Sequence, residues 1–334
     1  HIMDSIGKIC ILGGGTWGTA LAKIVLMNQK HMNWFIRRDD QIEGFYKLGH
    51  NPGYLPNVKF NLAQITFYSN IEKAIKDSDT IIIAIPSPYV KQYMRKIWLS
   101  STLKGKFVVS AVKGMIPNDN IVVSEYLMSS FKIPQEYIGV ISGPCHAEEV
   151  ALERLSFLTV ASYDTTRAKL LSDAIRSRIL NTSVSDDVVG IELAAVLKNI
   201  YAIIAGVCSG LQYGDNFQAV LMTHCAKEMK TLLDAIAPME RSICEQHYLG
   251  DMLVTGYSQF SRNRTLGTMI GKGYSVKTAQ LEMEMIAEGY YGAKCIHEMN
   301  NHFKVDIPIA QTAYEILYEK LRPQTAIDEL IKKF

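Results

Sequence analysis

The sequence lacks a large excess of charge of either sign. Its 334 residues include 35 Lys and Arg against 33 Asp and Glu, a formal net charge of +2. Without a strong field of one sign, we expect no nucleic-acid partner and no acidic tail. Hydrophobic residues make up 48% of the chain and charged residues 20%, which is typical of a folded globular protein. The length favours two domains.

Cysteines are few, and none are paired as C-x-x-C. They are scattered through segments with helix and strand character rather than along short loops. This spacing predicts reduced thiols in a cytoplasmic protein, and neither a disulfide framework nor a zinc site. The six cysteines are Cys10, Cys145, Cys208, Cys225, Cys244 and Cys295.

Targeting and membrane signals are also missing. His1–Asp4 has no basic stretch followed by an apolar run, so we expect no secretory signal. The most apolar stretch, Ile191–Val207, carries Glu192 and Lys198 and is short for a spanning helix. We therefore expect a soluble protein with no membrane span.

The chain does contain alternating strand and helix patterns in its first half. Apolar runs separated by helical segments predict a parallel sheet with helices on both faces. After about residue 187 only helical periodicity is found. The expected strands are Lys8–Leu12, Met32–Ile36, Thr80–Pro86, Phe107–Ala111, Tyr137–Ile141 and Phe157–Ala161, and the expected C-terminal helices are Val188–Val207, Asn216–Ile236, Val276–Met285 and Ala310–Glu319.

A glycine-rich turn follows the first expected strand. Gly13-x-Gly15-x-x-Gly18 opens a helix, a pattern typical of a loop that binds a dinucleotide pyrophosphate. The sequence thus predicts an α/β, Rossmann-like doubly wound domain over residues 3–187. An all-helical substrate and catalytic domain is expected over residues 188–334.

The residues after the second expected strand indicate which dinucleotide binds. Sites for NAD usually hold an acidic residue about 20 positions after the loop, which accepts from the ribose hydroxyls. Arg37 and Arg38 stand there instead. Guanidinium groups bind a 2′-phosphate well, so NADP(H) is the preferred cofactor, with NAD(H) left open. A solvated pair of arginines at the end of the strand is the alternative.

Lys198 lies in a strongly apolar helical segment. A buried ammonium is costly unless it is paired, and desolvation favours the neutral amine that proton transfer requires. A lysine whose head reaches solvent is the alternative. Lys113 and Gly143 each follow an expected strand, at the edge where open α/β sheets bind ligands. Ser261-Arg262-Asn263-Arg264 combines donors and cations that suit a phosphate monoester, and an exposed loop is the alternative for this segment taken alone.

Taken in order, these segments resemble the bacterial type of NAD(P)-dependent glycerol-3-phosphate dehydrogenase. The resemblance runs from about Lys8 to Tyr318 and implies interconversion of dihydroxyacetone phosphate and sn-glycerol 3-phosphate, for phospholipid synthesis. A homodimer is left open. The segments that carry the resemblance read GGGTWG, AIPS, AVKG, ISGP, LKN, LGD, SRNR and AEG.

The resemblance also implies roles for individual residues. Lys198 matches the proton-transfer lysine of the family, with Asp251 beside it. From their charges, we expect Asp251 to orient Lys198 and Lys113 to raise the local positive potential. The implied cofactor residues are Gly13, Gly15, Thr16, Trp17, Gly18, Arg37, Arg38, Lys113, Ala147, Arg262, Ile286 and Glu288. The implied substrate residues are Lys113, Gly143, Cys145, Lys198, Asn199, Asp251, Thr255, Ser261, Arg262 and Asn263.

Two positions depart from the family pattern. Trp17 stands where Tyr or Phe is usual, which keeps a flat ring beside the cofactor. Cys145-His146 replaces Thr-Phe after Gly143-Pro144, and a thiol is a weaker donor than a hydroxyl.

Two rival functions fit parts of the same pattern. A hydroxyacid reductase would need a carboxylate clamp in place of the Ser261–Asn263 run. A protein that senses NADP(H) without turnover would leave Lys198 and Asp251 with no role.

Overall fold

The structure is a computed structural model that describes residues 5–98 and 100–334. The expectation about a secretory signal, and residues 3–4 of the first expected domain, lie outside this range. The chain forms two compact units. The first contains residues up to Val112 and Val123–Val188, and the second contains Lys113–Val122 and Val189–Phe334. The Lys113–Val122 segment lies within the first expected domain in the sequence but belongs to the second unit in the structure, so one boundary along the chain cannot separate the two units.

An eight-stranded sheet forms the centre of the first unit, in the order β10-β9-β8-β5-β4-β1-β2-β3. The order reverses between β1 and β4, which makes the carboxyl ends of these two strands the expected ligand edge. The strands are β1 Ile9–Leu12, β2 Met32–Phe35, β3 Ile65–Tyr68, β4 Thr80–Ile83, β5 Phe107–Ser110, β8 Ile138–Ser142, β9 Ser156–Ser162 and β10 Leu180–Ser185.

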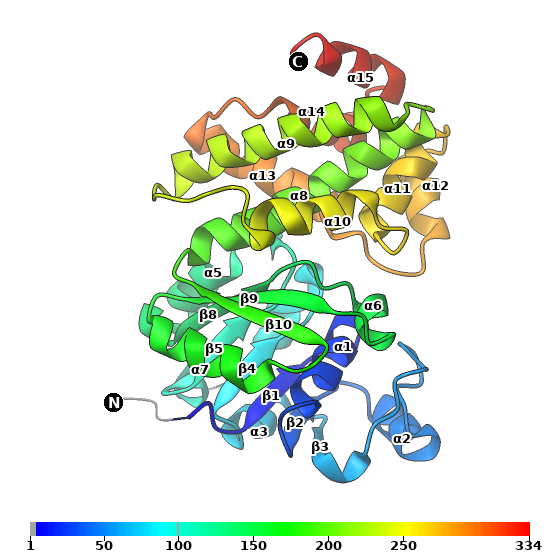
Figure 1. Cartoon of the computed structure of the whole chain (residues 1–334). Helices are drawn as coiled ribbons and strands as arrows, with labels where there is room; N and C mark the ends of the chain where they lie inside the picture. The colour runs from blue at the N-terminus through cyan, green and yellow to red at the C-terminus, as the bar shows by residue number, and fades with distance from the viewer. Residues whose placement is uncertain (1–4, 99) are drawn as a thin grey trace. The chain divides into compact units, whose positions relative to one another are not determined.

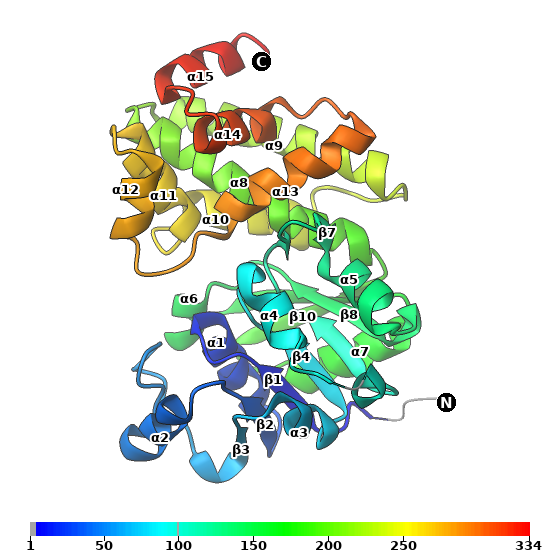
Figure 2. The same cartoon turned by 180° about the vertical axis from the view of Figure 1, so that it is seen from behind.

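Helices cover both faces of this sheet (Figures 1 and 2). β1 and β4 are buried along their whole length, as expected for strands covered on both sides. The α-helices of this unit are α1 Thr16–Leu26, α2 Asp39–Leu48, α3 Ile71–Lys76, α4 Val90–Met94, α5 Val123–Phe131, α6 Ala147–Ala151 and α7 Thr165–Ile175. Short 3-10 turns lie at Leu62–Gln64, Ser87–Tyr89, Ser100–Leu103 and Gln135–Tyr137.

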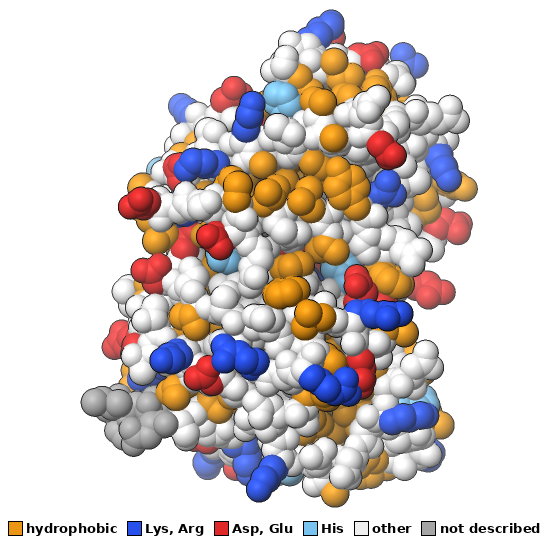
Figure 3. Space-filling view, viewed as in Figure 1, with side chains coloured by type: hydrophobic (Ala, Val, Ile, Leu, Met, Phe, Trp, Pro, Cys, Tyr) orange, Lys and Arg blue, Asp and Glu red, His pale blue; other side chains and the backbone are white. Residues whose placement is uncertain are grey.

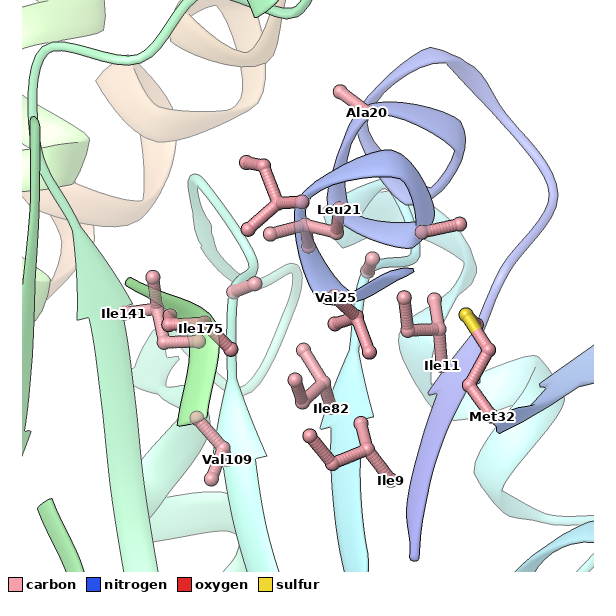
Figure 4. Packing of buried hydrophobic residues seen from close by; sticks show 14 of the residues in the cluster. Ile9, Ile11, Ala20, Leu21, Val25, Met32, Ile82, Val109, Ile141 and Ile175 are labelled. Atoms are coloured by element: carbon pink, nitrogen blue, oxygen red, sulfur yellow. The ribbon is translucent and has the colours of Figure 1, made fainter. Parts of the chain in front are cut away.

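The core of the first unit packs α1 against the sheet. Leu21 and Val25 of α1 lie over Ile11 and Ile82, which come from neighbouring strands (Figure 4). All four side chains are buried, and burying an aliphatic side chain contributes about 1.5–3 kcal/mol. This packing fixes the start of α1 at the carboxyl end of β1.

The expected α/β class is confirmed, with three differences in its elements. β8 and β9 pair antiparallel, so the sheet is not wholly parallel. β3 and β10 were not predicted. Both strands contain polar residues, most of all β10 (Leu180–Ser185), so neither appears in the sequence as an unbroken apolar run. A hairpin of β6 Met115–Ile116 and β7 Ile121–Val122 was also not predicted.

The second unit is helical apart from that hairpin, within the part of the chain that the structure describes. The expected helix Val276–Met285 ends at Glu282, and a single π-helical turn precedes α10. The elements are α8 Val188–Gly210, α9 Asp215–Ile236, η5 Gln246–Gly250, α10 Asp251–Tyr257, α11 Arg262–Gly271, α12 Val276–Glu282, α13 Glu288–Phe303, α14 Pro308–Tyr318 and α15 Pro323–Ile331.

Helix α8 is the central helix of the second unit. It has 23 residues, so the prediction that this stretch is too short to span a membrane was wrong. However, 94% of its most apolar window is buried inside the protein, as in the core helix of a soluble protein. Glycines let α11 approach it closely, since a Cβ on Gly206 would lie 2.1 Å from Arg264 O, and one on Gly267 2.0 Å from Ile203 O.

Glu228 of α9 is a buried carboxylate that joins α9 to α14. Its oxygens accept from the backbone N–H groups of Ile309 (2.7 Å) and Ala310 (3.1 Å), in the first turn of α14. Burial raises the pKa of Glu228 to about 7, although the two amides act in the opposite direction. The carboxylate is therefore held in a site that favours its protonated form.

This raised pKa predicts a pH-dependent stability. The folded-state pKa lies above the ordinary value of 4.5, so the contribution to stability is complete below about pH 4.5 and is lost as the pH rises through about 7. We expect the free energy of unfolding to fall by roughly 3 kcal/mol over that range. Urea unfolding at several pH values would measure it. Glu228→Gln should remove this slope, and Glu240→Gln, on an exposed residue, should keep it; equal slopes in both variants would contradict the prediction.

Candidate functional site

The glycine loop, Gly13–Gly18, runs from the end of β1 into the first turn of α1. Gly13 has a φ of +122°, and a Cβ there would lie 2.5 Å from the carbonyl oxygen of Ala84, just after β4. Only glycine fits this position. An ideal Cβ on Gly15 would meet nothing within 4 Å, so the space beside it is open. The loop therefore lies at the reversal point of the strand order, as a phosphate-binding loop requires.

Two carbonyl oxygens of the loop accept hydrogen bonds from side chains of the same unit. Trp34 Nε1 donates to Gly13 O (2.8 Å), and Thr19 Oγ1 donates to Gly15 O (2.7 Å). The C=O and N–H of a trans peptide point in opposite directions. The N–H groups of Gly14 and Thr16, which belong to the same two peptides, therefore point away from Trp34 and Thr19. The loop is thus arranged to present donors.

Sequence reasoning missed two further residues that hold this loop. Gln41 Nε2 and Asn51 Nδ2 both donate to Gly14 O, at 2.7 and 3.0 Å. Asn51 is fully buried. No local pattern could have identified it, because it lies 37 residues from Gly14 in the sequence.

Arg37 and Arg38 follow β2 with exposed side chains. Arg37 lies over the ring of Tyr93, with its guanidinium carbon 5.8 Å from the ring centroid. Arg38 forms a two-point ion pair with Asp40, which is likewise exposed. The hydrogen bond with Asp40 raises the pKa of Arg38, which is charged in any case. A 2′-phosphate would compete with Asp40 for this guanidinium.

The remaining expected residues of the first unit lie near the carboxyl ends of its strands. Thr16 and Trp17 begin α1, and Trp17 Nε1 donates to Ala111 O (2.8 Å), just after β5. Gly143 follows β8 with a φ of +154°, and a Cβ there would lie 2.5 Å from Phe157 O. Cys145 is buried at 2% exposure, and Ala147 begins α6.

The second unit contains the buried ion pair of Lys198 and Asp251. Lys198 projects from α8 and is 4% exposed, so its head does not reach solvent. Its Nζ donates to Asp251 Oδ2, at the start of α10. Asp251 is 1% exposed. Buried charges of this kind persist only when they are paired, and they often mark a functional site.

Thr255 lies one turn after Asp251 on α10. It is 3% exposed, and its hydroxyl has no hydrogen-bond partner among the described residues. A buried hydroxyl without a partner costs free energy. A ligand hydroxyl or carbonyl near the Lys198–Asp251 pair would satisfy it.

A chain of amide hydrogen bonds connects four segments of the second unit. Gly289 N donates to Asn263 Oδ1 (2.8 Å), Asn263 Nδ2 to Asn199 Oδ1 (3.1 Å), and Asn199 Nδ2 to Lys113 O (2.8 Å). A backbone donor begins the chain and a backbone acceptor ends it, so the orientation of both side-chain amides is fixed. Each amide nitrogen carries a second N–H, and these are suited to an anionic ligand.

Arg262 and Ser261 lie at the start of α11. Ser261 is the N-cap residue, and its Oγ accepts from Arg264 N (3.2 Å), which leaves the hydroxyl hydrogen for another acceptor. Arg262 Nε lies 2.7 Å from the thioether sulfur of Met285, a weak acceptor that a phosphate could replace. Ile286 precedes α13, and Glu288 is its first residue.

The expected site residues thus form two groups, one in each unit. The dinucleotide residues, with Gly143, Cys145 and Ala147, belong to the first unit. Lys113 and the residues from Lys198 onward belong to the second. On the face shown in Figure 3, Lys and Arg side chains are interspersed with Asp and Glu, in line with the balanced composition.

Comparisons with known proteins find one family over both halves of the chain. Residues 8–168 match the family model described as NAD-dependent glycerol-3-phosphate dehydrogenase N-terminus, and residues 187–328 match its C-terminus. The glycerol-3-phosphate dehydrogenase (NAD(P)+) of Syntrophomonas wolfei is 32% identical over 98% of this chain and 95% of its own. The corresponding enzyme of Bacillus subtilis is 31% identical, over 98% of this chain and 94% of its own.

A solved structure is similar over the same extent. The crystal structure of glycerol-3-phosphate dehydrogenase from Coxiella burnetii has a TM-score of 0.90 and 27% identity, and the match covers 97% of this chain and 98% of that one. The two family-model matches span residues of both units. The chain therefore belongs to the NAD-dependent glycerol-3-phosphate dehydrogenase family.

Proposed function

We propose that this chain catalyses reversible hydride transfer between NAD(P)H and dihydroxyacetone phosphate, giving sn-glycerol 3-phosphate for glycerophospholipid synthesis. The observation that carries the proposal is the buried Lys198–Asp251 pair, in the same unit as the donors of α11. Burying a lysine costs free energy, and a lysine that exchanges a proton with the substrate has a catalytic role that accounts for this cost.

The residues of the first unit fit a nicotinamide dinucleotide. Gly15 has open space beside it, and the carbonyl oxygens of the glycine loop are held by other donors. When bound, the nicotinamide carries the hydride. The loop amides would hold the pyrophosphate, and Trp17 and Ala147 would contact the cofactor at the sheet edge. The family resemblance also assigns Ile286 and Glu288 to the cofactor.

In the reduction, negative charge develops on the C2 oxygen of the substrate. We assign Lys198 to donate a proton to this oxygen and, in the reverse direction, to accept it. Asp251 holds the amine in position through its ion pair. The Thr255 hydroxyl would bond to the substrate, and the positive charge of Lys113 would stabilise the developing anion.

The phosphate group of the substrate is assigned to α11. Arg262 supplies a planar fork of donors, and Ser261 and Asn263 supply one donor each. The family resemblance also assigns Asn199, Gly143 and Cys145 to the substrate. The buried thiol of Cys145 has no part in the chemistry, because hydride transfer involves no covalent enzyme intermediate.

One assay separates this proposal from its rivals. Purified protein is mixed with NADPH and dihydroxyacetone phosphate, and the nicotinamide absorbance is followed. A fall in absorbance with this substrate, but not with unphosphorylated dihydroxyacetone or a 2-oxoacid, supports the proposal. Reduction of a 2-oxoacid instead would indicate a hydroxyacid reductase. Binding of NADPH without turnover would indicate a sensor.

We expect NADPH to be preferred over NADH because of Arg37 and Arg38. Replacing both with Gln should raise the KM for NADPH by about 10-fold to 100-fold, the range for losing a hydrogen bond to a charged group, with little change for NADH. Asp40→Asn should lower the KM for NADPH, because it frees Arg38 from its ion pair. Equal efficiency with both cofactors in the native protein would refute the preference, but not the reaction.

The protein is proposed to act in the cytoplasm. None of the six cysteines forms a disulfide in the described part of the chain, and five of them are buried, which suits a reducing compartment. A homodimer remains a prediction, and light scattering of the purified chain would test it.

A further inference from the structure

The glycine loop has to present N–H groups to a pyrophosphate, so its peptide planes need a fixed orientation. Gly14 and Gly15 are adjacent, and a peptide between two glycines rotates easily because neither has a Cβ. A rotation would point the Gly14 carbonyl oxygen towards the phosphates and repel them. The orientation of this peptide therefore depends on what holds Gly14 O.

Asn51 holds two of the loop carbonyls, one directly and one through Thr19. Its Nδ2 donates to Gly14 O (3.0 Å) and also to Thr19 Oγ1 (2.8 Å). Thr19 Oγ1 in turn donates to Gly15 O (2.7 Å). Gly15 O also accepts the first backbone hydrogen bond of α1, from Thr19 N (2.9 Å), so the helix itself helps to orient the N–H of Thr16. Because C=O and N–H are antiparallel in a trans peptide, the bonds to Gly14 O set the direction of the N–H of Gly15.

The orientation of the Asn51 amide is itself fixed. Its Oδ1 accepts from Gly53 N (3.0 Å), a backbone group that can only donate. Gln41 Nε2 donates to the same oxygen (3.2 Å) and to Gly14 O (2.7 Å). Asn51 must therefore turn its NH₂ towards the loop, and Gly14 O receives two donors, one for each lone pair.

We propose that Asn51, supported by Gln41, is a positioning residue for the dinucleotide: it fixes the peptides of the glycine loop with their N–H groups towards the pyrophosphate. This inference rests on the proposed use of NADP(H). Asn51 contributes through the loop rather than by contact with the cofactor. An acidic residue in its place would offer acceptors where donors are needed and add a negative charge behind the loop.

To test this, the Kd for NADPH is measured for folded variants by fluorescence titration, and their thermal unfolding is measured in parallel. Asn51→Asp should raise the Kd for NADPH by about 10-fold to 100-fold, the range for weakened hydrogen bonds to a charged group. The KM for dihydroxyacetone phosphate at saturating NADPH should stay near the native value. Gln41→Glu, on the more exposed residue, should raise the Kd in the same direction and decides the matter if Asn51→Asp does not fold.

Asn33→Asp is the matched control. Asn33 is another buried asparagine of the first unit, and its Nδ2 donates to Asp77 O and Ser78 Oγ, away from the glycine loop. This variant should lose stability but keep the native Kd. An unchanged Kd in folded Asn51→Asp or in Gln41→Glu overturns the inference, and so does an equal rise in Asn33→Asp. If the native protein does not bind NADPH, the proposed function fails first.

Discussion

Replacing Lys198 by alanine is expected to lower turnover by at least about 10³-fold in both directions. A general acid–base group contributes about 10²–10⁴ in rate, and stabilisation of the developing alkoxide adds to it. The Kd for NADPH should change little, because the glycine loop belongs to the other unit. Lys198→Arg should be inactive as well, since a guanidinium stays protonated and cannot accept a proton. Turnover measured in both directions, with cofactor titration, would check this.

The variant also breaks a buried ion pair, so stability has to be separated from chemistry. Removing one partner of such a pair costs about 3–5 kcal/mol, because the other charge stays buried. Adding Asp251→Asn to Lys198→Ala should recover much of this stability without restoring turnover. Lys227→Ala, on an exposed lysine of α9, should behave like the native protein. Retention of about a tenth of native turnover in Lys198→Ala would remove Lys198 from the mechanism.

Replacing Arg262 by lysine is expected to lower kcat/KM for dihydroxyacetone phosphate by about 10-fold to 100-fold, and replacement by alanine by more. Lysine keeps the charge but loses the planar fork that makes two parallel bonds to a phosphate, each worth about 1.5–3 kcal/mol. With unphosphorylated dihydroxyacetone, which should be a poor substrate for both proteins, the native enzyme and the variant should have the same kcat/KM. Initial rates with both substrates would test this.

Arg264 provides the control for this second prediction. It lies on the same helix, but its Nε donates to the backbone carbonyl of Gly256 (2.8 Å). Arg264→Lys should therefore affect stability more than KM. A similar loss of kcat/KM in Arg264→Lys, or an equal loss with both substrates in Arg262→Lys, would show that α11 was disturbed as a whole and that Arg262 does not bind the phosphate.

The sequence by itself was sufficient to predict the α/β class, the glycine loop and the helical second half. These features depend on local patterns. Buried strands such as Thr80–Ile83 read as unbroken apolar runs, and a glycine-rich turn between a strand and a helix has a recognisable spacing. The apolar surroundings of Lys198 also indicated that it would be costly to bury. The family resemblance then supplied the substrate and the role of each residue.

Only the tertiary structure decided which groups meet. Lys198 is paired with Asp251, 53 residues away, and Asn51 with Gly14, 37 residues away. The same holds for the antiparallel pairing of β9, for the polar edge strand β10, and for the union of Lys113–Val122 with the second unit. Hydrophobic periodicity indicates which face of a helix or strand is buried, but not which other element packs against that face. Partners are chosen by the packing of the whole chain, because a buried donor or charge is stable only where that packing supplies its acceptor.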